Sequence, residues 1–146
     1  LLDEYRYYAA ELPSDDKNSI KSWRSKDPYY GYNLDLTGDR NKVHWAHYFD
    51  RPGYEAVSMY EGGCLYEYGV WRPEYISCME DNRPYYNAPS REAIVRRIMR
   101  ASGKTFNMED FISKDKIRSE KGAPQTKTDY VTEAFVPFAP PIRVER

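Results

Sequence analysis

The pattern of apolar and polar positions predicts one clear amphipathic helix. Its apolar residues recur at spacings of three and four, opposite a row of arginines; they are Ile94, Val95, Ile98 and Met99. Ser90 is the predicted N-cap, and Glu92 lies in the first turn, where a carboxylate complements the helix dipole. Gly103 ends the pattern, since glycine readily adopts the left-handed conformation. We therefore expect a helix near residues 90–102.

Three other segments have weaker helical patterns. Residues 1–12 place Leu2, Tyr5 and Ala9 on one helix face before Pro13. Residues 55–61 can form a short helix that the glycines at 62 and 63 would stop. Residues 107–113 predict a short capped helix.

The remaining segments predict extended chain and loops. Branched and aromatic side chains favour extended backbone over residues 65–71. Pro73 then keeps Arg72 out of the helical region, which predicts a bend that presents the guanidinium. Residues 14–39 are polar and are expected to form a long loop that lines a cleft or covers an edge of the core. Together these elements predict an α+β, loop-rich fold.

Composition narrows the choice of partners. The 146 residues suit one domain, and fifteen tyrosines against five phenylalanines predict rings whose hydroxyls need hydrogen-bond partners, as in clefts that bind peptides or sugars. The net charge of -1, with dispersed lysines and arginines, argues against a nucleic-acid or membrane-surface partner. No apolar run is long enough to predict a membrane span.

Both cysteines lie in the window with the most turn-forming and aromatic residues, from Tyr54 to Met79. Cys64 and Cys78 could form a disulfide or remain buried free thiols. Arg72, in the same window, could contact a substrate or form a buried pair with Glu61. Such a concentration of special residues suggests a shaped site.

Four blocks of the sequence, at residues 2–5, at Trp45 and His47, at 61–79 and at 87–94, resemble in the same order the IgA-peptidase-type family of bacterial zinc metallopeptidases. Residues 2–5, LDEY, resemble the LxDEY segment that follows the HExxH helix of that family. The other matching positions are Trp45 and His47, then the methionine-turn pattern formed by EGG at 61–63, Tyr66, Gly69, Trp71-Arg72-Pro73 and Ser77-Cys78-Met79, and finally NAPSREAI at 87–94. The resemblance implies that residues 1–103 are the C-terminal subdomain of a metzincin-like catalytic domain and that 104–146 are an extended tail or linker packing on it.

The same resemblance implies a set of site residues. Asp3 is the first choice and Glu4 the second for the carboxylate that completes a zinc site. Met79 would form the hydrophobic floor beneath the metal. The substrate-cleft candidates are Glu61, Tyr66 and Arg72. From the residues alone, the two carboxylates could instead complement a helix dipole, and the methionine could be an ordinary core residue.

No HExxH motif occurs in the sequence. By resemblance, its histidines and glutamate would come from an upstream segment of the same chain, and residues 1–146 alone are expected to be inactive. The implied function of the complete protein is zinc-dependent hydrolysis of protein or peptide substrates, and its implied location is secreted or cell-surface in a bacterium. Two alternatives stay open: a non-catalytic extracellular protein- or glycan-binding module, and a structural zinc site at His44-x-x-His47.

Overall fold

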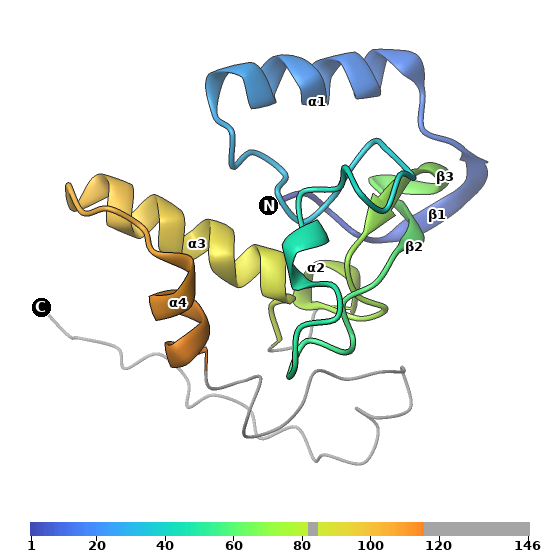
Figure 1. The fold of residues 1–146 in the computed structure, drawn as a ribbon. Coiled ribbons are helices and arrows are strands. Elements are labelled where there is room, and N and C mark those ends of the chain that lie inside the picture. Colours follow the sequence, from blue (N-terminus) through green and yellow to red (C-terminus); the bar gives the residue numbers. More distant parts are fainter. Residues whose placement is uncertain (82–84, 116–146) are drawn as a thin grey trace, which may run out of the picture.

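The computed structural model describes residues 1–81 and 85–115, which form an α+β fold (Figure 1). Its elements are, in chain order, β1 (Arg6–Glu11), α1 (Ser14–Lys26), the 3-10 helix η1 (Ala46–Tyr48), β2 (Tyr60–Gly63), β3 (Leu65–Arg72), α2 (Cys78–Asp81), α3 (Ala88–Ala101) and α4 (Met108–Lys114). The general α+β class is therefore as predicted. Of the predicted tail, residues 116–146 lie outside the described residues.

The three strands form one small mixed sheet in the order β1-β3-β2. β2 and β3 are antiparallel, and Gly63 pairs with Tyr66, so that Cys64 and Leu65 are the two residues of the hairpin turn. Their φ angles of 52° and 73° are those of a type I′ turn, which matches the twist of the strands. β1 is parallel to β3, and the connection between them includes α1. The predicted extended segment 65–71 is confirmed as β3.

The helix predicted for residues 1–12 is wrong, because Arg6–Glu11 form strand β1. Every residue of this strand is exposed, so it has no buried face whose period would identify it in the sequence. Its conformation depends on pairing with β3, where Arg6 lies opposite Leu65. The helix predicted over 55–61 is also wrong, since β2 begins at Tyr60 and pairs with β3 instead.

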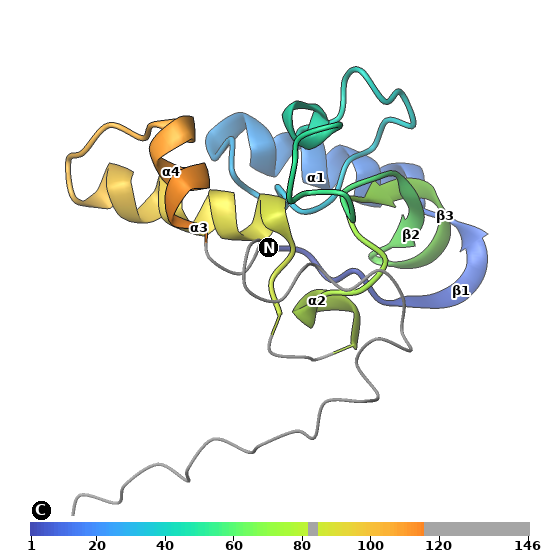
Figure 2. The ribbon, with the colours of Figure 1, turned by 60° about the horizontal axis from the view of Figure 1, so that its bottom comes forward.

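The long loop predicted for residues 14–39 is wrong over Ser14–Lys26, which form helix α1. Ile20 is its one buried residue, and for this reason the segment has no apolar stripe. Charge supports the helix instead: Asp15 and Asp16 lie in the first turn and Arg24 and Lys26 in the last. Figures 1 and 2 show α1 on one side of the sheet, and Ile20 packs there in a small core cluster with Leu12, Leu34 and Val70.

The predicted helix near 90–102 is confirmed as α3, but it starts earlier than expected. Asn87, rather than Ser90, is the N-cap, and its side chain accepts the Ser90 backbone N–H at 3.0 Å. The predicted apolar stripe is only partly covered, since Ile94 is 36% and Ile98 is 60% exposed. The short helix predicted over 107–113 is confirmed as α4, with Asn107 as its cap.

A larger core cluster joins α4 and the start of α3 to residues 43–57. Its buried members are Val43, Trp45, Tyr48, Tyr54, Val57, Ala88, Phe111 and Ile112. Within the described parts of the chain, none of the helices has the length and apolar character needed to cross a membrane.

Candidate functional site

Glu4 is a fully buried carboxylate that binds side chains from three distant segments. Oε1 accepts hydrogen bonds from Nδ2 of Asn33 and Nδ2 of Asn87, each at 2.7 Å. Oε2 accepts the hydroxyl of Ser77, 73 residues away in sequence, at 2.7 Å. Burial raises the pKa of Glu4 to about 7, and the three side-chain hydrogen bonds, which favour the charged form, oppose that rise. Both carboxylate oxygens are therefore engaged within the protein.

Asp3, the neighbour of Glu4, has the opposite environment. It is exposed, and its Oδ1 accepts the backbone N–H of Tyr5 at 2.8 Å. Its backbone carbonyl accepts the N–H of Cys64 at 2.8 Å, which fixes this segment against the hairpin turn. Of the two predicted zinc ligands, Asp3 is the one that an ion can reach without breaking a buried network.

The predicted methionine turn lies directly beside this carboxylate pair. The backbone N–H of Glu4 donates to the carbonyl of Met79 at 2.8 Å. The N–H of Met79 in turn donates to Oγ of Ser77 at 3.1 Å, the same oxygen whose hydroxyl binds Glu4. Ser77 and the first two residues of α2, Cys78 and Met79, together called the Ser77–Met79 turn below, are thus joined to the Asp3–Glu4 segment through both main chain and side chain. The half-buried side chain of Met79 belongs to this turn.

Two of the three substrate-cleft candidates have contacts within the hairpin. Arg72 is buried, and its Nη1 donates to the carbonyls of Glu61 at 2.7 Å and Gly62 at 3.1 Å. Oε1 of Glu61 accepts the backbone N–H of Gly69 at 3.0 Å. Arg72 is extended and the chain bends at Pro73, as expected. The expected presentation of the guanidinium is wrong, because Arg72 is buried and binds the main chain of Glu61 rather than its carboxylate.

Tyr66, the third cleft candidate, lies on β3 close to the surface. It is half-buried, and its ring centroid is 5.3 Å from that of Tyr8 on β1. Tyr66 also lines a cavity beside α1. Among the three cleft candidates it is the one whose position suits contact with a ligand.

The two histidines each lie beside a different carboxylate. Nδ1 of His44 is 2.6 Å from Oδ2 of Asp35, although that contact is poorly aligned for a hydrogen bond. Nε2 of His47 is 2.8 Å from Oε2 of the buried Glu92. Burial acts to raise the pKa of Glu92, but the bonds from His47 and Arg96 outweigh it and hold that pKa below its usual value. These contacts match packing histidines better than a shared metal.

A protein zinc site needs three or four ligands from histidine, cysteine or carboxylate side chains. Across residues 1–81 and 85–115, no three or more His, Cys, Asp or Glu side chains are grouped so as to hold a metal ion. Asp3 fits the role of a single carboxylate ligand because its oxygens are accessible. The remaining zinc ligands would have to come from residues other than these.

Both cysteines are free thiols, so of the two sequence alternatives the structure has the unpaired one. Burial, followed by the nearby carboxylates of Asp3 and Asp16, raises the pKa of the Cys64 thiol to about 11. A thiol of this kind is a poor nucleophile at neutral pH, so a catalytic role for Cys64 is not supported.

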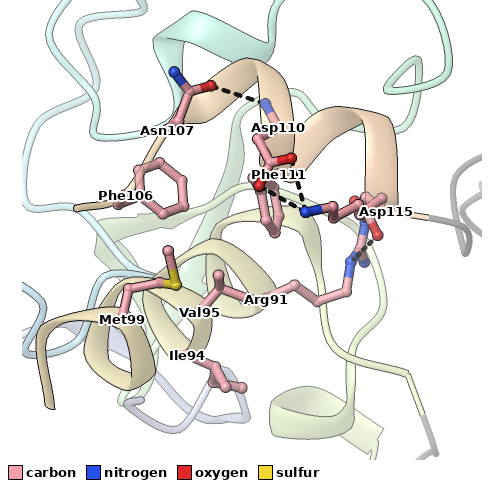
Figure 3. A pocket seen from close by; sticks show the side chains of 10 residues that line it. Arg91, Ile94, Val95, Met99, Phe106, Asn107, Asp110, Phe111 and Asp115 are labelled. Carbon is pink, nitrogen blue, oxygen red and sulfur yellow. Dashed lines mark hydrogen bonds and ion pairs between the residues drawn. The ribbon is translucent and has the colours of Figure 1, made fainter. Parts of the chain in front are cut away.

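A separate apolar cavity of about 400 Å³ lies between α3 and α4 (Figure 3). Val95, Met99, Phe106 and Phe111 form its apolar lining. Arg91 borders it and is bound to Asp115 at 2.7 Å. Its described lining includes none of the predicted site residues.

Sequence reasoning missed the polar residues that surround Glu4. Asn33 lies in the segment predicted to be a long loop, and Asn87 and Ser77 were seen only as parts of longer motifs. A second buried carboxylate was also missed: Glu74 accepts the Tyr85 hydroxyl at 2.6 Å and the Ala88 N–H at 2.8 Å. No local pattern in the sequence marks these residues, because the burial of Glu4 and Glu74 depends on partners that are distant in the chain.

No protein-family model matches the chain, and neither a curated protein nor a solved structure matches it.

Proposed function

We propose that this chain is the C-terminal part of the catalytic domain of a zinc-dependent endopeptidase. The observation that supports this most is the hydrogen bond from the Glu4 N–H to the Met79 carbonyl at 2.8 Å. It brings the predicted zinc-binding segment and the predicted methionine turn together, as the resemblance to IgA-peptidase-type enzymes requires. The buried carboxylate of Glu4 then keeps the two segments in place through Ser77.

In this proposal Asp3 holds the zinc together with two histidines of an upstream HExxH segment. Zinc, when bound, supplies a Lewis acid that polarises the scissile carbonyl and lowers the pKa of a bound water. Glu4 does not ligate the metal but fixes the backbone of Asp3 against the turn. The side chain of Met79 would contribute to the apolar surface beneath the metal.

The substrate class of this proposal is protein or peptide, and the location is the outside of a bacterial cell, either secreted or at the cell surface. Both follow from the resemblance. The exposed tyrosines around β1 are compatible with such a partner, because tyrosine is favoured at protein-binding surfaces.

The test is zinc content in the protein extended by its upstream coding sequence. We expect one zinc per chain, measured by atomic absorption after dialysis, and peptidase activity that a chelator removes. Asp3→Asn should lose the zinc without unfolding, since Asp3 is exposed. Asp15→Asn, which changes another exposed carboxylate in the first turn of α1, is the matched control and should retain it. An extended protein that binds no zinc, or an Asp3→Asn variant that keeps it, would refute the assignment.

A non-catalytic binding module is the second candidate. It is favoured by a cluster of exposed side chains on two neighbouring strands and the segment before them: Tyr5, Tyr7, Tyr8, Leu65 and Tyr68, which are 40–73% exposed. Exposed apolar patches commonly mark interaction sites. This hypothesis would be favoured if the protein extended by its upstream coding sequence bound a protein or glycan stably and contained neither zinc nor an HExxH motif.

A further inference from the structure

The cavity between α3 and α4 can hold an aromatic side chain. Its volume is about 400 Å³, whereas a cavity of roughly 150 Å³ is enough for a benzene ring. Figure 3 shows Val95 and Met99 on α3 across from Phe106 and Phe111. The ring centroids of Phe106 and Phe111 are 5.8 Å apart, so one wall of the cavity is aromatic.

Part of this apolar lining is accessible from outside. Val95, Met99 and Phe106 are half-buried, and Ile94, which also lines the cavity, is 36% exposed. Removing such apolar surface from water is favourable, because the hydrophobic effect is proportional to the apolar area that becomes covered. The cavity therefore offers a favourable site for a further apolar segment.

The charged residues of the described lining are paired with one another. Arg91 binds Asp115 at 2.7 Å, and Lys114 binds Asp110 at 2.8 Å. The side chain of Asn107 caps α4 by accepting the backbone N–H of Asp110 at 2.9 Å. A charged ligand would have to lose its hydration or compete with these ion pairs, whereas an uncharged apolar segment would not. The lining therefore favours an uncharged occupant.

The described part of the chain ends at this cavity. Asp115 follows the last residue of α4 and lies in the lining with Lys114. Its carboxylate accepts hydrogen bonds from the guanidinium of Arg91 at 2.7 and 3.0 Å and from the hydroxyl of Tyr54 at 3.0 Å. These bonds fix the position of Asp115, so the segment 116–146 starts beside the cavity.

The sequence of that segment contains an occupant of suitable chemistry. Residues 134–142, AFVPFAPPI, are the longest run in the chain without Asp, Glu, Lys or Arg. Phe135 and Phe138 are three positions apart, and Pro137 lies between them. Proline favours the polyproline II helix, in which residues three apart lie on the same side. Aromatic-lined grooves bind such proline-containing segments because these lose little conformational entropy on binding.

We propose that residues 135–138 of this same chain bind in the cavity between α3 and α4, with their two phenyl rings against its apolar walls. The 19 residues between Asp115 and Phe135 can span about 65 Å when extended, so the connection does not restrict the fit. Joining site and ligand in one chain gives a local concentration of the order of a millimolar, at which a site with a dissociation constant of about 0.1 mM is about nine-tenths occupied. The inference is independent of the proposed peptidase activity, because none of the predicted zinc or cleft residues takes part in it.

A photochemical cross-link in the full chain identifies the occupant. Phe138 is replaced by p-benzoylphenylalanine, whose excited ketone reacts preferentially with the C–H bonds of methionine, and the irradiated protein is analysed by mass spectrometry after digestion. We expect a link to Met99 or to another lining residue, and a mixture of ¹⁴N- and ¹⁵N-labelled chains should show that it forms within one chain. The same replacement of Tyr130, an aromatic residue outside the uncharged run, is the control and should not label the cavity. Links from position 138 to residues outside the lining, or links between two chains, would overturn the proposal.

A synthetic peptide of residues 131–146 measures the affinity of the site. The double substitution Phe135→Ser and Phe138→Ser in the full chain should free the cavity, so that the added peptide shifts the amide signals of Val95 and Met99 in the ¹⁵N-labelled protein. The unaltered chain should bind the peptide about tenfold more weakly, because its own segment competes at a local concentration of the order of a millimolar. Equal binding by the two proteins, or shifts confined to residues outside the lining, would overturn the proposal.

Two neighbouring residues of α3 test the position of the site in the doubly substituted chain. Met99→Ala should weaken binding of the peptide about fivefold or more, because Met99 supplies apolar contact area in the cavity. Ile98→Ala is the matched control, since Ile98 is 60% exposed and outside the described lining, and it should leave binding unchanged. Alanine is a good helix former, so both variants should keep α3, which circular dichroism verifies. Equal affinity of the two variants for the peptide would overturn the proposal.

Discussion

Replacing Ser77 by alanine should strongly destabilise the fold. Ser77 is completely buried, and its Oγ takes part in two hydrogen bonds, donating to Glu4 Oε2 at 2.7 Å and accepting the Met79 N–H at 3.1 Å. A hydrogen bond to a charged group is worth about 1.5–3 kcal/mol, and an ordinary one about 1 kcal/mol. The variant also leaves a buried carboxylate oxygen and a backbone N–H without these bonds. We therefore expect a loss of about 3 kcal/mol in the free energy of unfolding.

Urea denaturation at pH 8, followed by tryptophan fluorescence, measures this loss. With slopes of about 1–3 kcal/mol per molar urea for small domains, the midpoint should fall by about 1–3 M. Ser113→Ala is the matched control, because Ser113 is exposed on α4 and its hydroxyl binds the Asp110 carbonyl at 2.8 Å. That variant should change stability by less than about 0.5 kcal/mol. If the two variants had equal stability, the Glu4 network would not be what holds the Ser77–Met79 turn.

Three further measurements follow from the structure. Gly63→Ala should lower the free energy of unfolding by about 2 kcal/mol, because φ is +156° and the new Cβ would lie 2.9 Å from Leu34 Cδ2; unchanged stability in urea would contradict this. The rate of alkylation of Cys64 by iodoacetamide, followed by mass spectrometry, should rise about tenfold per pH unit between pH 8 and pH 10, since its pKa is raised to about 11; a plateau near pH 9 would refute the shift. The lowered pKa of Glu92 stabilises the fold at pH values above the usual pKa of a carboxyl group, and this contribution is lost as the pH falls through the folded-state pKa. Glu92→Gln should therefore show a weaker loss of stability between pH 6 and pH 3. An identical profile would refute the stabilising role of the bonds from His47 and Arg96 to Glu92.

Helix α3 could be predicted from sequence because its signals are local. The apolar residues recur at helical spacing, and Gly103, which has a φ of 69°, follows the last turn. Its N-terminus was misplaced because Ser90 and Asn87 are both good caps, and only the bond to the Ser90 N–H distinguishes them. α4 was predictable for the same local reasons.

The elements that failed depend on distant partners or on charge. β1 has no buried residue of its own and exists through pairing with β3 about sixty residues later. α1 buries only Ile20, so apolar periodicity predicts a polar loop for this segment instead of a helix. The strand conformation of β1 is determined by residues far away in the sequence. The helical conformation of α1 is indicated by the acidic residues in its first turn and the basic residues in its last turn.

For the candidate site, the structure brings the two predicted segments together, but the sequence alone could not distinguish the two neighbouring carboxylates. Asp3 and Glu4 are adjacent carboxylates, and the sequence motif fits either of them as a metal ligand. In the structure, however, Asp3 is exposed and Glu4 is completely buried. What separates them is the pair of asparagines and the serine that surround Glu4, at sequence distances of 29, 83 and 73 residues. A carboxylate with no exposed surface cannot be kept without such donors, because an unpaired buried charge is far too costly. The three donors and Glu4 therefore act as one unit. Together they fix the backbone of Asp3 against the Ser77–Met79 turn. The proposed metal site would need to be rigid at this point, because a metal ligand has to be held in a defined position.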